Sequence, residues 1–155
     1  MTADRSRDHH DSAWVLDWYN GLAPLRIIGM RAVGVGVGWS RAELDPPDDL
    51  RNPNGAVNGG VLSSFIDQTG GLTVAGTIRD SETAATIELG IHFLRAAKRT
   101  PLTATAHVVR RGRSFMFLSI EVEDDHGQAC LNATGTWAVG RGSGLPDDPA
   151  IESAV

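Results

Sequence analysis

Asp67 is the residue of this chain whose surroundings most strongly suggest chemistry. It is the only acidic residue between Asp49 and Asp80, and the residues around it are small or apolar. A lone carboxylate in such surroundings is a candidate general base or nucleophile. The second candidate group is the backbone N–H of Gly59, which has no partner if a helix begins there and which lies at the positive end of its dipole. Glycine has no side chain that would block a substrate carbonyl, so this N–H could stabilise an oxyanion.

One helix must position both groups. The segment Asn52–Val57 contains Asn-Pro and Asn-Gly, which favour turns, and Asn58 is a good N-cap for a helix from about Gly59 to Gly76. At 100° per residue, one face of this helix is an apolar stripe that we expect to face the core. The opposite face carries only small residues and one carboxylate: Gly60, Ser63, Ser64, Asp67 and Gly71.

This small-residue face indicates that another chain or a ligand comes close to the helix, and an ordinary helix–helix contact is the simpler alternative. Gly59 and Asp67 are eight residues apart, hence about 12 Å along the helix axis. One subunit therefore cannot easily bring both groups to one carbonyl, whereas two antiparallel copies of the helix could. We accordingly predict a two-fold dimer with composite sites.

The remaining chain predicts an α+β domain. A short helix over Ser12–Gly21, capped by Ser12, comes before a long strand over 26–44. Four further strand patterns, over 86–93, 102–110, 114–123 and 128–139, are joined by Gly-containing turns and predict an antiparallel meander. The glycines at 34, 36 and 38 do not fit a dinucleotide-binding fingerprint and instead predict a strand face that is flat enough for another element to lie against it.

Length and composition limit the function classes. The length of 155 residues predicts one domain, and the single Cys130 excludes an intrachain disulfide framework. The net charge of −5 argues against nucleic acid as the main partner, because phosphate contacts need an excess of basic residues. It shows neither a signal sequence nor a membrane-spanning run, so we expect a cytoplasmic protein with no membrane partner. We expect a disordered segment at 1–11, the folded domain at 12–139 and a flexible tail at 140–155.

The motif pattern resembles the hotdog-fold acyl-CoA thioesterases, in particular the branch named after the phenylacetic-acid-degradation (PaaI-type) thioesterases. That branch has an Asn, His-Gly-Gly six residues later and an Asp nine residues after the His. This chain has Asn52, Asn58–Gly59–Gly60 and Asp67 at the same spacings. The strand that opens at Thr86, the segment 109–114 and the final 133–137 also match in character. The resemblance implies a long central helix wrapped by an antiparallel sheet of five to six strands.

The resemblance also implies roles for individual residues. Asp67 would be the nucleophile, or the base that activates water, against a thioester carbonyl that the Gly59 N–H of the other subunit polarises. Asn52 would position the water or thioester, and a Thr86 hydroxyl would hold the water or Asp67. Asn58 departs from the family's His, and an amide cannot act as an acid near neutral pH. We therefore assign Asn58 the roles of capping the helix and hydrogen bonding.

Coenzyme A would arrive as part of the substrate, without a metal or any other cofactor, and its phosphates need cations. Basic residues cluster at the turn with Arg110, Arg111 and Arg113, and after the preceding strand at Arg95, Lys98 and Arg99. We expect the first cluster, with Gly60 and Ser63, to contact the substrate. Family resemblance favours a homotetramer built from two homodimers.

Two other functions remain open on the same fold. One is an acyl-thioester hydratase or dehydratase, although those enzymes use a His that position 58 lacks. The other is a non-catalytic acyl-CoA-binding module.

Overall fold

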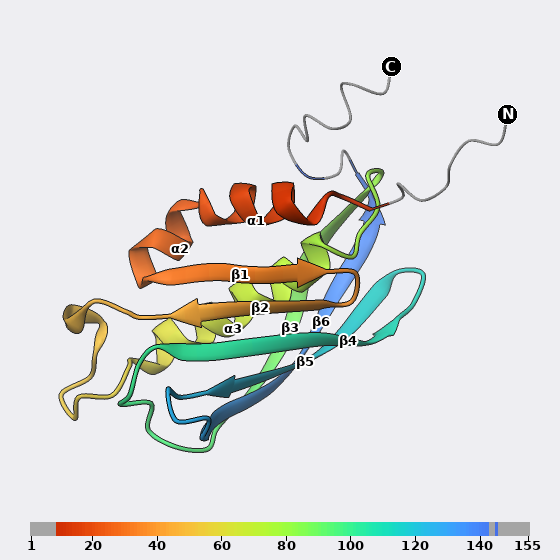
Figure 1. The fold of residues 1–155 in the computed structure, drawn as a ribbon. Helices are drawn as coiled ribbons and strands as arrows, with labels where there is room; N and C mark the ends of the chain where they lie inside the picture. The colour runs from red at the N-terminus through yellow and green to blue at the C-terminus, as the bar shows by residue number, and fades with distance from the viewer. Residues whose placement is uncertain (1–8, 143–144, 146–155) are drawn as a thin grey trace, which may run out of the picture.

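The computed structural model describes residues 9–142 and 145 and consists of one curved antiparallel sheet around one long helix (Figure 1). The strands lie in the order β1-β2-β4-β5-β6-β3. Their bounds are β1 Met30–Gly36, β2 Trp39–Leu44, β3 Glu82–Phe93, β4 Leu102–Arg111, β5 Phe115–Glu123 and β6 Ala129–Arg141. The helices are α1 Ser12–Asn20, α2 Ala23–Ile28 and α3 Gly59–Ala75, with a 3-10 turn at Asp48–Leu50. The predicted α+β class is confirmed.

Helix α3 is the core element of the molecule, because it contacts all six strands. It begins and ends where the sequence predicts, with Asn58 as the N-cap and Gly76 as the C-cap. The predicted apolar stripe is buried, including the fully buried Phe65 and Ile66. Gly60 and Ser64, on the opposite face, are exposed. The sheet therefore wraps one side of α3 and leaves the small-residue side uncovered within the protomer.

Two predictions near the N-terminus are wrong. The helix α1 is capped by Asp11, whose side chain accepts the Trp14 N–H at 2.9 Å, and not by Ser12. The segment 26–44 is a short helix and a hairpin, not one strand. Gly29 ends α2 at φ 77°, and Gly38 turns β1 into β2 at φ 83°. Both backbone conformations favour glycine and interrupt an extended chain.

The predicted meander is correct for β4, β5 and β6 only. β3 pairs with β6 along its length and is not a neighbour of β4. The reason is the connection over 94–101, which is longer than a tight hairpin turn and carries the chain across the end of the sheet. β3 also begins earlier than predicted, and β6 continues to Arg141. Of the predicted terminal segments, 1–8, 143–144 and 146–155 lie outside the described residues.

The two edges of the sheet differ. At β1, the Asn20 side chain accepts the Ala32 N–H at 2.8 Å and donates to the Ala32 carbonyl at 3.0 Å, which satisfies the strand edge. Within the described residues, no comparable bond covers the outer edge of β3. That edge is long, and the apolar side chains of Ile87 and Phe93 on it are 56% and 54% exposed. Uncovered edges of this length commonly pair with another chain.

The predicted flat face of β1 accommodates an indole ring. A Cβ at Gly36 would lie 2.5 Å from Trp39 Nε1, and one at Gly34 would lie 3.0 Å from the same ring. The Trp39 side chain thus packs flat across β1 and remains 42% exposed on the outer face of the sheet. Separately, none of the helices among the described residues is long and apolar enough to cross a membrane.

Candidate active site

Asp67 and Thr86 meet at the open side of α3. The Thr86 hydroxyl donates to Asp67 Oδ1 at 2.8 Å. Helix α3 supplies the carboxylate and the first half of β3 supplies the hydroxyl, so the bond joins residues 19 positions apart. It fixes the orientation of the carboxylate and leaves its second oxygen available to a proton donor. The sequence placed these two residues in one site, and the structure brings them together.

A cavity of about 240 Å³ opens beside this carboxylate. It runs between the second half of α3 and the start of β3, and Trp18 and Tyr19 of helix α1 form another of its walls. Its walls combine aromatic, small and polar side chains, and its lining residues include Trp18, Tyr19, Asp67, Gln68, Gly71, Ala75, Thr83, Thr86, Trp137 and Leu145. The cavity can therefore hold an apolar group whose reactive end lies at Asp67.

Tyr19 links α1 to this wall. Its hydroxyl lies 2.7 Å from the Gln68 carbonyl oxygen, to which it donates. Burial, and secondly the negative charge of Asp67, raise the pKa of this phenol. Tyr19 is therefore neutral at physiological pH, and its hydroxyl can donate the hydrogen bond to the Gln68 carbonyl oxygen. Nothing in the sequence indicated that Trp18, Tyr19 or Trp137 would lie beside Asp67.

Asn52 and Gly59 lie in a different cavity, of about 360 Å³, which shares no lining residue with the first. The Asn52 side-chain oxygen accepts the backbone N–H groups of Asn54 at 2.9 Å and Ala56 at 3.1 Å. This turn uses the oxygen of the amide, so its NH₂ group is the part that a ligand can reach. The Phe93 ring flanks Gly59, with 3.7 Å between its Cε1 and an ideal Cβ at that position.

Asn58 leaves the Gly59 N–H available. Its side-chain oxygen accepts the Gly60 N–H at 2.8 Å, as expected for an N-cap. No acceptor is recorded for the Gly59 N–H in the described part of the chain. The positive end of the α3 dipole therefore lies at a residue that lines this cavity. Of the other predicted contact residues, Gly60 has its N–H capped, and the Ser63 hydroxyl donates to the Gly59 carbonyl at 2.8 Å.

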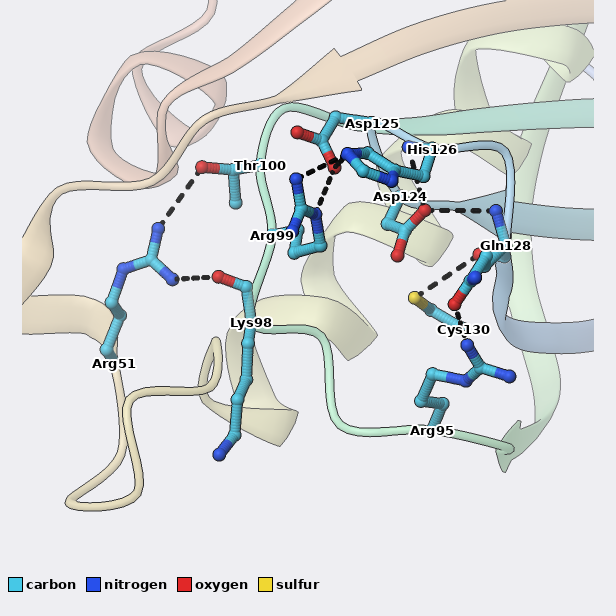
Figure 2. Close-up of polar contacts among 10 residues, drawn as sticks. All are labelled: Arg51, Arg95, Lys98, Arg99, Thr100, Asp124, Asp125, His126, Gln128 and Cys130. Carbon is cyan, nitrogen blue, oxygen red and sulfur yellow. Dashed lines mark hydrogen bonds and ion pairs between the residues drawn. The ribbon is translucent and has the colours of Figure 1, made fainter.

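The loop after β3 carries three cations, Arg95, Lys98 and Arg99 (Figure 2). Arg95 lines the cavity and donates to Gln128. Arg51 ties the Asn52 turn to this loop through the Lys98 carbonyl and the Thr100 hydroxyl, both at 3.2 Å. Arg99 is held by Asp125 at 2.8 Å, whereas the Lys98 side chain points away from these contacts.

The predicted cluster of Arg110, Arg111 and Arg113 lies at the other end of β3. Arg111 is paired with Glu82, the first residue of β3, at 2.6 Å, while Arg110 and Arg113 are exposed. Burial works against the charged form of Glu82, but the Arg79 N–H and the Arg111 guanidinium outweigh it and lower the Glu82 pKa. Arg111 is thus engaged within the protomer, and Arg110 and Arg113 carry the charge that faces solvent.

The protomer therefore contains two half-sites on one helix. Asp67 and Thr86 form the first, which we call the carboxylate half-site. Asn52, Asn58 and Gly59 form the second, the donor half-site. Gly59 is the first residue of α3 and Asp67 lies in its middle, about 12 Å further along the axis, while Thr86 lies in the first half of β3 and Phe93, beside Gly59, ends it. A single substrate carbonyl therefore cannot easily reach both half-sites within one protomer.

Comparisons with known proteins identify relatives of this arrangement. A family model described as thioesterase superfamily matches residues 54–131. The chain is 33% identical to a candidate esterase of Halobacterium salinarum over 88% of this chain and 93% of that protein. It is 24% identical to the 1,4-dihydroxy-2-naphthoyl-CoA hydrolase of Listeria monocytogenes over 63% of this chain and 80% of that protein.

Among solved structures, the PaaI protein of Escherichia coli, from its phenylacetic acid degradation operon, superposes with a TM-score of 0.74. That match is 20% identical and covers 86% of this chain and 96% of the other. At this identity the likeness concerns the fold, and it confirms the predicted hotdog fold.

Proposed function

Since this chain belongs to the thioesterase superfamily, we propose that it hydrolyses acyl-CoA thioesters to a free acid and coenzyme A. The observation that carries the proposal is the Asp67 carboxylate, held by Thr86 at 2.8 Å beside a cavity of about 240 Å³. A fixed carboxylate next to a largely apolar cavity suits water activation or direct attack at an acyl carbon. The naphthoyl-CoA hydrolase among its relatives supports coenzyme A as the leaving group.

The active form that we propose is a dimer in which two β3 strands pair edge to edge, antiparallel. The carboxylate half-site uses the start of β3 and the donor half-site lies at its end. Thr86 and Phe93 are seven residues apart, or about 23 Å along an extended strand. Antiparallel pairing places the start of one β3 beside the end of its partner's. The open β3 edge and its exposed apolar side chains support this arrangement.

The chemistry then divides between two subunits. Gly59 N–H of the partner subunit donates to the thioester oxygen, and the partner's Asn52 amide orients it. Asp67 takes a proton from water as the water oxygen attacks the acyl carbon, and the tetrahedral intermediate expels the thiolate of coenzyme A. In the alternative covalent route, Asp67 itself attacks the acyl carbon, the C–S bond breaks to release the thiolate of coenzyme A, and water opens the resulting anhydride. The oxyanion charge is stabilised identically in both routes.

The two basic clusters support a nucleotide-bearing substrate. Arg110 and Arg113 lie near the start of β3, and Arg95 and Lys98 follow its end. The same antiparallel pairing would bring one cluster of each subunit to each composite site. In a chain of net charge −5, four cations at the two ends of one strand suit the phosphates of coenzyme A.

Thiol release from a panel of acyl-CoAs tests the proposal. We expect turnover by the wild type and a loss of at least about 100-fold in Asp67→Asn, which keeps the size of the side chain. Tight binding of acyl-CoA without thiol release would instead identify a binding module. Single-turnover hydrolysis in ¹⁸O-water tests for the covalent route: label in Asp67 demonstrates an anhydride that water opens at the Asp67 carbon, whereas activated water leaves Asp67 unlabelled and labels only the acid product.

A further inference from the structure

Trp137 lies directly beside the carboxylate half-site. It is the ladder partner of Thr86 on β6, so its side chain projects from the same face of the sheet as the hydroxyl that holds Asp67. The ring is 2% exposed, yet Trp137 lines the Asp67 cavity. The indole thus forms part of the wall that an acyl group would meet immediately behind the reacting carbon.

Two glycines accommodate this ring between the helix and the sheet. A Cβ at Gly70, one turn after Asp67 on α3, would lie 2.3 Å from Trp137 Cη2. A Cβ at Gly135, two residues before Trp137 on β6, would lie 2.4 Å from its Cζ3. The benzene ring of the indole therefore occupies the space between α3 and β6 that side chains at these positions would otherwise fill.

We propose that Trp137 limits the length of the acyl group, an inference that rests on the proposed thioesterase activity. With the indole in place, the gap between α3 and the sheet is closed, and the acyl group is confined to the groove bordered by Tyr19, Ala75 and Thr83. This groove suits short or compact acyl groups. Without the indole, the groove continues past Gly70 into the interior, where a straight chain can extend.

Trp137→Leu tests the inference with straight-chain acyl-CoAs from butanoyl to dodecanoyl. The leucine side chain is smaller than tryptophan by roughly six heavy atoms, which leaves space for about three methylenes of the acyl chain. Each methylene that is buried raises the equilibrium constant for transfer from water roughly fourfold. We expect the wild type to favour the short substrates. In the variant, the ratio of kcat/KM for dodecanoyl-CoA to that for butanoyl-CoA should rise at least about tenfold.

The chain offers a matched control. Trp39 also packs over two glycines, but on the outer face of the sheet and away from both half-sites. Trp39→Leu should lower thermal stability without changing the chain-length ratio. A Gly70→Ala substitution added to Trp137→Leu places a methyl group in the opened space and should reverse part of the gain. A merely structural role of Trp137 would change none of these ratios.

An unchanged ratio in a folded, active Trp137→Leu variant overturns the inference, as does equal turnover of all chain lengths by the wild type. If Trp137→Leu does not fold, Trp137→Phe serves the same purpose with a smaller expected shift of about threefold. If the wild type releases thiol neither from these straight-chain substrates nor from aromatic acyl-CoAs, the proposed function is wrong and the inference falls with it. The two failures are therefore distinguishable.

Discussion

Gly59→Pro deletes one N–H group from the donor half-site and little else. Gly59 is the first residue of α3, where proline is favoured because the N–H has no partner within the helix. The residue before a proline must be extended, and Asn58 already has φ −60° and ψ 139°. The nearest atom to a Cβ at position 59 is Phe93 Cε1, at an ordinary contact distance of 3.7 Å. The local backbone therefore suits proline, and there is room for its Cβ.

The expected effect is on catalysis and not on stability. Removing one oxyanion donor typically lowers kcat by about 10²–10³-fold, or about 2.7–4 kcal/mol of transition-state stabilisation. The free energy of unfolding should change by less than about 0.5 kcal/mol, because no helical hydrogen bond is lost. The assay is thiol release from an acyl-CoA under saturating substrate, with urea unfolding measured on the same preparation.

Gly59→Ala is the matched control, since it adds a methyl group and keeps the N–H. It should retain kcat within about threefold of the wild type. A folded Gly59→Pro variant with near-normal kcat would refute the assignment of this N–H as the oxyanion donor. Equal losses in both variants would point to crowding by Phe93 in place of hydrogen bonding.

Three further predictions concern the two half-sites and their supports. Thr86→Val removes a hydrogen bond to the Asp67 carboxylate and should lower kcat by about 10–100-fold, whereas Thr86→Ser should stay near wild type in the same assay. Asn58→Ala loses the cap and should lower the free energy of unfolding in urea by about 1 kcal/mol. Because the pKa of Glu82 is lowered in the fold, its contribution to stability is present above its unfolded value and lost as pH falls through the folded value. Arg111→Met should therefore reduce the loss of Tm between about pH 6 and pH 3, and an unchanged pH profile would contradict this pairing.

The sequence was most informative where the physics is local. Helix α3 could be predicted at both ends because Asn58 is a cap and its apolar stripe has helical periodicity. The eight-residue spacing within α3 already indicated that Gly59 and Asp67 cannot easily serve one carbonyl within one subunit. The identity of Thr86 as the partner of Asp67 came from resemblance, since no local pattern relates a helix to a strand 19 residues later.

Other features depend on long-range packing and were missed for that reason. The Asp67 cavity is closed by Tyr19, which is 49 residues from the Gln68 it contacts. The alternating glycines of β1 correctly predicted a close neighbour, but not that the neighbour is the Trp39 ring from the next strand. Arg111 reads as one of three equivalent cations in the sequence, whereas Glu82 engages it in the fold. Pairing of this kind appears only once distant segments are placed side by side.

Mixing two inactive variants tests the composite site most directly. Asp67→Asn lacks the carboxylate, and Gly59→Pro lacks the donor, so each homodimer has two defective sites. In a mixed dimer, one site carries both defects and the other carries neither. Random exchange of subunits makes about half of the dimers mixed, so activity should recover to about a quarter of the wild-type value. If the mixture, after unfolding and refolding together, is no more active than the separate variants, the two half-sites do not combine across subunits.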